Sequence, residues 1–491
     1  MARDIYISRT TLVISLVIIL CVVSLAFMTI EERYVAAPAF ACIIMVIWLW
    51  MILWDRDKKI PFFDVGFICA LATLIYSVFP LLNYWADGLN FGLLGDFRLQ
   101  TFNITPADLG FFHLRHVLYI FSFVVFYVAF RGRGIIETGN VNSPDPSTKQ
   151  IIILFFLLLT GYFLILRIMT GINYNTSYEP EAYARNRSAF ANAPLILLQI
   201  SGKLGGILFL FKLALLYLVV SRCTHRSWRI ILLIWVTAEI INALVLKGGR
   251  SGLLLFLLAT LLFYHRLIKQ LTMKFLITSG TMLFVFFIFL GVYRQYINID
   301  FLKFDLSEEN VDFLTSTNEF QALLGTAYDV HLLKESGATI PWYLYINDIV
   351  NVLPPQQLLP FEKIPAWDWY LREIGLSGTG LGLMWGVISQ SIVGLDWIEL
   401  FLRGALLGYI LARFHRWYLK HQAGFFGTLI YVFLCLKVYY TFRDTTFSLL
   451  TDFIWEILPF YLLLRLTVGH SLFQITPSTK ENLTFAANSK R

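Results

Sequence analysis

A cationic, glycine-rich hexapeptide, Lys247-Gly248-Gly249-Arg250-Ser251-Gly252, lies between two almost purely apolar runs. Two consecutive glycines allow a ligand to approach the backbone closely. A helix that begins near Ser251 directs unpaired N–H groups and the positive end of its dipole at the same point. Arg250 adds a planar guanidinium, which suits phosphate. The hexapeptide therefore predicts a binding site for a phosphate or pyrophosphate headgroup; the alternative is an ordinary hairpin whose basic residues anchor it to anionic lipid.

Further arginines are expected on the same, outer side of a membrane: Arg185, Arg187, Arg294, Arg372 and Arg443. This side of a membrane protein is normally poor in basic residues. The set therefore favours a polyanionic ligand. Each arginine taken singly is also compatible with a side chain that snorkels to the interface.

The chain that must position these residues has the composition of a helical membrane protein. It is 491 residues long, 58% hydrophobic and only 14% charged, with a mean hydropathy of +0.68, whereas soluble proteins carry roughly 25% charged residues. The net charge of +7 does not indicate nucleic-acid binding, because the basic residues cluster beside apolar runs. The 5 cysteines show neither a disulfide framework nor metal-ligand spacing. We expect no metal and no cofactor.

Apolar runs predict an all-α bundle of about twelve membrane-spanning helices, in a single transmembrane domain over residues 1–491. The spans are expected at about 11–29, 35–54, 65–82, 112–130, 151–169, 194–220, 230–246, 252–265, 275–292, 397–413, 425–441 and 448–466. Basic residues concentrate in alternate loops, which places both termini in the cytoplasm. This topology leaves a large periplasmic loop at 293–396 and a cytoplasmic tail at 467–491.

The large periplasmic loop is rich in aromatic residues, which offer flat faces to sugar rings: Trp342, Tyr343, Tyr345, Trp367, Trp369 and Tyr370. Nearby amides and carboxylates can bind hydroxyl groups. Sugar binding is therefore favoured over the alternative, an aromatic belt at the membrane interface. The apolar segment 381–395 would reverse the charge pattern if it crossed the membrane. We expect it to form a surface or re-entrant helix instead.

Ionisable residues inside the predicted spans must pair or face a cavity. Glu399 and Arg403 lie four residues apart on one helix face, which predicts a structural ion pair. Asp452 and Glu456 also share a face, and two adjacent carboxylates need a cation. The sequence offers Lys437 or the neighbouring Arg443 for this role.

The order of these parts resembles the Wzy-type O-antigen (oligosaccharide repeat unit) polymerases. The resemblance covers about residues 150–466. It rests on Gly248-Gly249-Arg250-Ser251-Gly252 at the start of a span, on the late outer loop, on the progression from Gly380-Leu381-Gly382 to Gly404 and Gly408, and on Arg443 near the outer end of the penultimate span. Gln390 departs from the pattern, because many relatives carry an acidic residue there. The related O-antigen ligases share the same plan, a GT-C-like glycosyltransferase bundle.

The resemblance implies a metal-independent glycosyltransferase at the periplasmic face of a Gram-negative inner membrane. Donor and acceptor would both be oligosaccharides on undecaprenyl pyrophosphate, and the growing glycan would move onto the incoming repeat unit. Membrane lipid and a chain-length regulator protein are further expected partners, and nucleic acid is not.

This chemistry needs cations for the leaving group and a base for the acceptor hydroxyl. Arg250, Arg294 and Arg443 are expected to stabilise the pyrophosphate. His331, the only histidine between residues 293 and 380, is the favoured base. The weaker candidates are His113, His116 and Glu319.

Two alternatives remain open. An O-antigen ligase would transfer the glycan to lipid A core. A transporter or flippase of lipid-linked sugars would also need many spans and cationic cavities, but it should show internal repeats, and the sequence has no convincing one.

Overall fold

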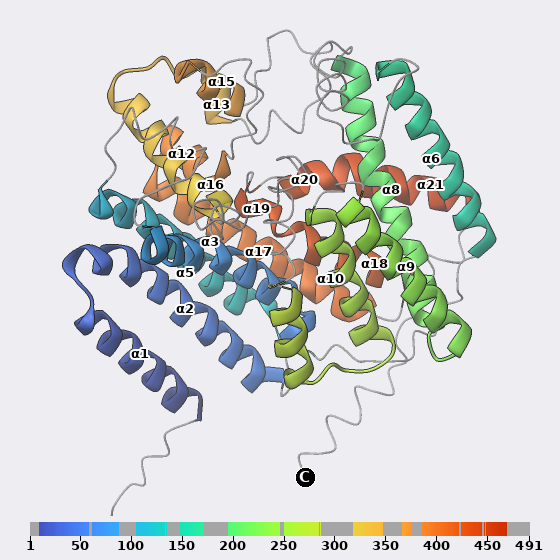
Figure 1. Cartoon of the computed structure of the whole chain (residues 1–491), viewed down its shortest axis with the longest axis horizontal. Coiled ribbons are helices and arrows are strands. Elements are labelled where there is room, and N and C mark those ends of the chain that lie inside the picture. Colours follow the sequence, from blue (N-terminus) through green and yellow to red (C-terminus); the bar gives the residue numbers. More distant parts are fainter. Residues whose placement is uncertain are drawn as a thin grey trace, which may run out of the picture.

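The computed structural model describes residues 9–57, 61–87, 105–132, 134, 148–170, 195–245, 250–283, 285, 318–346, 366–375, 385–421, 424–443, 446 and 448–468. All regular secondary structure in these residues is helical (Figure 1). The expected all-α class is therefore confirmed for the described part of the chain.

The described residues up to Leu267 form nine helical elements. They are α1 (Arg9–Phe27), α2 (Ile30–Asp57), the short η1 (Pro61–Phe63), α3 (Val65–Asp87), α5 (Pro106–Arg131), α6 (Thr148–Thr170), α8 (Leu195–Ser221), α9 (Arg226–Val245) and α10 (Arg250–Leu267). Residues 273–283 are also helical.

The second part combines long helices with several very short ones. It contains α12 (Asn318–Glu335), α13 (Trp342–Tyr345), α15 (Ala366–Glu373), α16 (Gly386–Val393), α17 (Trp397–His421), α18 (Phe425–Lys437), α19 (Tyr440–Arg443), α20 (Ser448–Asp452), the π-helical turn η5 (Phe453–Ile457) and α21 (Leu458–Val468). In Figure 1, α13 and α15 lie at the upper left, above α12 and α16.

The helices are those of a membrane-embedded protein. Within the described residues, five are long and apolar enough to cross a membrane: Ile30–Asp57, Val65–Leu82, Pro106–Arg131, Thr148–Ile168 and Lys203–Ser221. Three apolar helices are shorter: Val13–Phe27, Gly252–Leu267 and Phe425–Lys437. The larger number of spans expected from the sequence stays a prediction.

The segment 381–395 contains only the eight-residue helix α16 among its described residues, and every residue of this helix is buried. Such a helix rises ~12 Å, against a hydrocarbon thickness of ~30 Å. By itself, α16 therefore cannot cross a bilayer.

Helices α5 and α17 form the most extensively packed helix pair of the described bundle. A Cβ added to Gly404 of α17 would lie only 2.6 Å from the carbonyl oxygen of Tyr119 in α5, and Gly408 makes a similar approach one turn later. Small residues four apart let two membrane helices bring their backbones together. The glycines noted in the sequence thus act as packing positions, and the α5–α17 pair is the spine of the fold.

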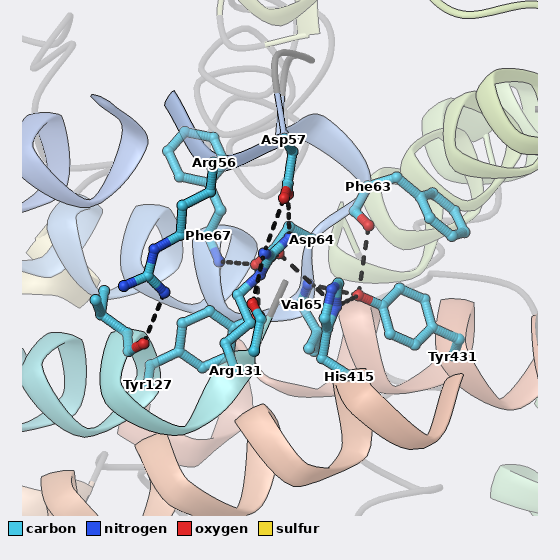
Figure 2. A network of polar contacts seen from close by, with 12 residues as sticks. Arg56, Asp57, Phe63, Asp64, Val65, Phe67, Tyr127, Arg131, His415 and Tyr431 are labelled. Atoms are coloured by element: carbon cyan, nitrogen blue, oxygen red, sulfur yellow. Dashed lines mark hydrogen bonds and ion pairs between the residues drawn. The ribbon is translucent and has the colours of Figure 1, made fainter. Parts of the chain in front are cut away.

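One end of this spine carries a buried network of charges, in which Asp64 is central (Figure 2). Its carboxylate accepts hydrogen bonds from Arg131 Nε at 2.7 Å, from the Tyr127 hydroxyl at 2.7 Å and from the backbone N–H of Phe67 at 3.0 Å. Arg131 also pairs with Asp57 at the end of α2. Asp64 is therefore both the N-cap of α3 and the counter-ion of α5.

The same network extends to α17 and α18. His415 Nδ1 lies 2.6 Å from the Tyr431 hydroxyl and 3.7 Å from Asp64 Oδ2. The Tyr431 hydroxyl in turn accepts the backbone N–H of Val65 at 3.0 Å. Five helices (α2, α3, α5, α17 and α18) are thus joined at one end. By the predicted topology, this end is cytoplasmic.

Candidate functional site

The opposite end of the spine collects most of the described candidate residues. Arg115 and Arg131 are 16 positions apart on α5, which corresponds to ~24 Å along the helix. Arg115 is fully buried and makes a bidentate ion pair with Asp396, with nitrogen–oxygen distances of 3.0 and 2.9 Å. This pair fixes the turn between α16 and α17 against α5.

The predicted anion site is only partly within the described residues. Arg250 is the first residue of α10, as expected for a helix that the hexapeptide opens. The side chains of Arg250 and Ser251 are outside the described part of the chain. So are the following residues in full: Lys247, Gly248, Gly249, Arg185, Arg187 and Arg294. The phosphate-binding role of this group stays a prediction.

Arg443 ends the four-residue helix α19, which is held by the residue before it. Phe442 is buried, and its ring lies 4.7 Å from that of His116 and 5.4 Å from those of Tyr76 and Tyr119, measured between centroids. These three rings come from α3 and α5. They fix the backbone from which the Arg443 side chain extends.

Helix α16 begins against the same backbone. Gly386 has a φ of +72°, which strains any residue with a Cβ. A Cβ there would lie 2.5 Å from Leu323 of α12 and 3.7 Å from the carbonyl oxygen of Arg443. The other end of α16 is capped by Lys334, whose ammonium donates to the carbonyls of Ile392 at 2.6 Å and Gly394 at 3.1 Å. The position of α16 is therefore fixed at both ends.

The candidate bases differ in how far their side chains are exposed to solvent. The His331 side chain is 28% exposed, and its Nε2 lies 3.2 Å from Glu335 Oε1. His113 and His116 are fully buried, and His116 Nδ1 lies 3.2 Å from the Ser77 hydroxyl. Neither can touch a substrate in this conformation. For Glu319, α12 gives the backbone position only.

Gln390 has a structural role that explains its amide. The side chain is fully buried. Its oxygen accepts the Trp385 indole N–H at 2.9 Å, and its nitrogen donates to the Leu344 carbonyl at 2.6 Å. An ionised carboxylate could accept the first bond but could not donate the second. Gln390 thus joins α16 to α13, which is a physical reason for an amide rather than an acidic residue at this position.

The aromatic residues expected to bind sugar divide into two groups. Tyr343, Trp369 and Tyr370 are buried, and the Tyr370 hydroxyl donates to Asp329 of α12. In contrast, Trp342 is 58% exposed and Tyr345 is 46% exposed. The Trp367 side chain is outside the described residues. Arg372 is exposed in the last turn of α15.

Both predicted ion-pair arrangements within the spans are confirmed. Glu399 and Arg403 approach to 2.6 Å. Lys437 lies 3.1 Å from Asp452 and 3.1 Å from Glu456, beside the π-helical turn η5. Lys437, one of the two cations that the sequence offered, therefore pairs with both carboxylates.

Sequence reasoning missed several residues that organise this end. Arg115 was available as an arginine inside an apolar run, a rare placement that signals a buried partner. The partner, Asp396, is far away in sequence and could not be chosen. Lys334 carried no such signal, because a lysine at a helix end is common.

No protein-family model matches the chain, and it matches neither a curated protein nor a solved structure. Within the described residues, no group of three or more His, Cys, Asp or Glu side chains could hold a metal ion. The chain's own residues and their arrangement are therefore the basis for assigning a function.

Proposed function

We propose that the protein is an oligosaccharide repeat unit polymerase of the O-antigen type. It would transfer a growing glycan from undecaprenyl pyrophosphate onto an incoming lipid-linked repeat unit, at the periplasmic face of a Gram-negative inner membrane. The proposal includes the full set of about twelve spans, cytoplasmic termini and a GT-C-like arrangement.

The observation that carries this proposal is the contrast between the two ends of the α5–α17 spine. At one end, buried contacts of Asp64, Arg131 and His415 join five helices. At the other, the four-residue helices α13 and α19 carry exposed aromatic rings and an arginine, and the 18-residue helix α12 carries a partly exposed histidine. A transporter must open at both faces in turn. Buried ion pairs near both ends, including Arg115–Asp396 at the outer one, favour a fixed bundle, and the exposed groups at the outer end favour an enzyme that receives its substrates there.

The proposed reaction needs only the chain's own groups. The bond from the anomeric carbon to the pyrophosphate oxygen breaks, and the same carbon bonds to an acceptor hydroxyl oxygen. The hydroxyl proton passes to a base, for which His331 is the accessible candidate. Arg443 and Arg250 would stabilise the departing pyrophosphate, whose negative charge increases in the transition state.

A gene deletion tests the proposal in cells. Loss of a polymerase should leave lipid A core carrying a single repeat unit, because the ligase and flippase still act. A core without any repeat, together with accumulated lipid-linked polymer, would identify a ligase instead. Single units trapped in the cytoplasm would identify a flippase.

A reconstituted assay tests the chemistry. The purified protein, given lipid-linked repeat units with a chelator and no nucleotide, should lengthen them. The only energy source would then be the sugar–pyrophosphate bond. Strict dependence on a divalent ion, or transport without lengthening, would reject the proposal.

The topology can be tested separately by cysteine accessibility. Lys420 is exposed near the end of α17, on the side that the proposal places in the cytoplasm. A Lys420→Cys variant should react with an impermeant maleimide only after the cells are permeabilised. Labelling in intact spheroplasts would reverse the assigned orientation.

A further inference from the structure

Two exposed aromatic side chains share one rigid turn. Trp342 and Tyr345 are three residues apart on α13, so they lie on the same side of the helical turn. The two residues between them, Tyr343 and Leu344, are buried and hold the turn against the rest of the protein.

This turn is fixed to its neighbours by side chains that leave little freedom. The buried amide of Gln390 holds the Leu344 carbonyl. On the α15 side, the Trp369 indole N–H donates to the carbonyl of Thr339, three residues before Trp342, at 3.3 Å. A preorganised aromatic surface loses little entropy when a ligand binds.

Helix α16 connects this turn to Arg443, the candidate cation for the leaving group. A Cβ on Gly386 would lie 3.7 Å from the Arg443 carbonyl oxygen, and Gln390, four residues later on α16, donates to the Leu344 carbonyl. These four residues correspond to a rise of ~6 Å. Leu344, between the two aromatic residues, is therefore connected to the Arg443 backbone through about one turn of α16, a separation that a short oligosaccharide can span.

The surroundings of the turn differ from those of the lipid-exposed helices. Helices α6 and α9 expose runs of aliphatic and phenyl side chains, such as Phe156, Leu157, Leu233 and Ile234. Near α13, one aliphatic side chain, Ile346, is exposed, together with the polar side chains of Ser336, Thr339, Arg372 and Glu373. Flat aromatic faces among hydroxyl and charged groups match a carbohydrate, whose ring has a C–H face and a hydroxyl edge.

We propose that Trp342 and Tyr345 form a carbohydrate subsite, which binds a sugar ring of the oligosaccharide while its pyrophosphate end lies at Arg443. The subsite rests on the proposed function only in that its ligand is the lipid-linked glycan. It assigns the sugar contact to two of the aromatic residues of the loop and gives a structural role to the buried ones.

Binding can be measured without turnover. The probe is the free oligosaccharide repeat, released by mild acid from the polysaccharide of the source strain and titrated into wild-type protein in nanodiscs. The Trp342→Ala/Tyr345→Ala double variant should bind at least tenfold more weakly. Trp342→Phe should retain most of the affinity because a flat ring remains. Trp85→Ala removes an aromatic side chain of similar exposure, 46%, on α3 and should bind as the wild type does.

Lipid contact is the competing outcome, and fluorescence separates it from sugar contact. The fluorescence of Trp342 is obtained by subtracting the emission of the Trp342→Phe variant from that of the wild type. It should be quenched by iodide in solution and protected by the oligosaccharide. Quenching by brominated phospholipid instead would identify an interfacial anchor and overturn the subsite. Equal affinity of the double variant and the wild type, or no binding by the wild type, would also overturn it.

The two proposals can fail independently. If the deletion strain shows a polymerase defect but the double variant binds normally, only the subsite is wrong. If the double variant loses oligosaccharide binding but the deletion shows a ligase or flippase defect, the subsite stands and the reaction must be reassigned.

Discussion

The backbone of Gly408 in α17 contacts the backbone of Phe123 in α5, so closely that a Cβ on the glycine would lie 2.4 Å from the Phe123 carbonyl oxygen. Because that oxygen belongs to a helix backbone, it cannot move aside as a flexible side chain could. The contact makes Gly408 a position where only hydrogen fits.

Gly408→Ala should therefore destabilise the bundle, by about 1–3 kcal/mol for overpacking. Gly161 of α6 is the matched control, since a Cβ there meets nothing within 4 Å. Gly161→Ala should be neutral or stabilising by up to ~1 kcal/mol, because alanine favours the helix. Thermal unfolding in detergent measures both. Equal melting temperatures for the two variants would contradict the tight α5–α17 packing.

A second prediction concerns Asp64, which lies between η1 and α3, before the membrane-spanning segment. Burial would raise the pKa of this carboxyl, but the Arg131 charge and the Tyr127 hydrogen bond hold it below its ordinary value. A lowered folded-state pKa contributes stability above the unfolded pKa of about 3.9, and this stability is lost as the pH falls through the folded-state value.

Asp64→Asn should cost about 3–5 kcal/mol at pH 7, because Arg131 loses a buried counter-ion. The variant should also lose part of the acid sensitivity that the wild type shows below about pH 4. Melting temperatures measured from pH 7 to pH 3 test both effects. Asp55→Asn, which changes an exposed carboxylate near the end of α2, should follow the wild-type profile. Unchanged stability of the Asp64→Asn variant would mean that this network does not hold the five helices together.

The third prediction compares two roles for residue 390: the catalytic role of an acidic residue in the Wzy-type pattern, and the structural role that the contacts of Gln390 indicate. If the acidic residue of the Wzy-type pattern acted here, Gln390→Glu should raise activity. The structure predicts the opposite, because an ionised glutamate cannot donate to the Leu344 carbonyl and would be buried at a position where the amide now serves as a donor. Gln390→Glu should lower the melting temperature and shorten the polymer, whereas Gln390→Met, of similar volume, should be milder. Higher activity in the glutamate variant would restore a catalytic role to this position.

Features that depend only on residues close together in the sequence, such as helices and pairs one turn apart, could be predicted. Apolar runs predicted the long helices, since each helix satisfies its own backbone in a membrane. Glu399 and Arg403 are one turn apart, so their pairing followed from helix geometry. The need to neutralise two adjacent carboxylates in an apolar run left Lys437 and Arg443 as candidates, and the structure shows Lys437 beside both carboxylates.

Contacts between residues that are far apart in the sequence could not be predicted in this way. Nothing near Arg115 in sequence indicates Asp396, which is 281 residues away. The network of Asp64, Arg131 and His415 also depends on how α3, α5 and α17 assemble. The aromatic residues of the outer loop have the same sequence signature, and only tertiary packing separates the exposed Trp342 and Tyr345 from the buried Trp369 and Tyr370.

The last prediction tests the proposed leaving-group cations. Arg443→Ala should lower polymer formation by about a hundredfold or more, which is typical for the loss of a group that stabilises transition-state charge. Arg250→Ala should abolish long-chain polymer while the protein still inserts normally. Lysine at either position should rescue poorly, because a point charge replaces a bidentate fork.

Arg413→Ala, which removes an exposed arginine on α17 at the expected cytoplasmic side, is the control and should leave chain length unchanged. Polymer length on gels, together with protein levels in the membrane, gives the readout. Full chain length with Arg250→Lys and Arg443→Lys would mean that both arginines are anchors at the membrane interface.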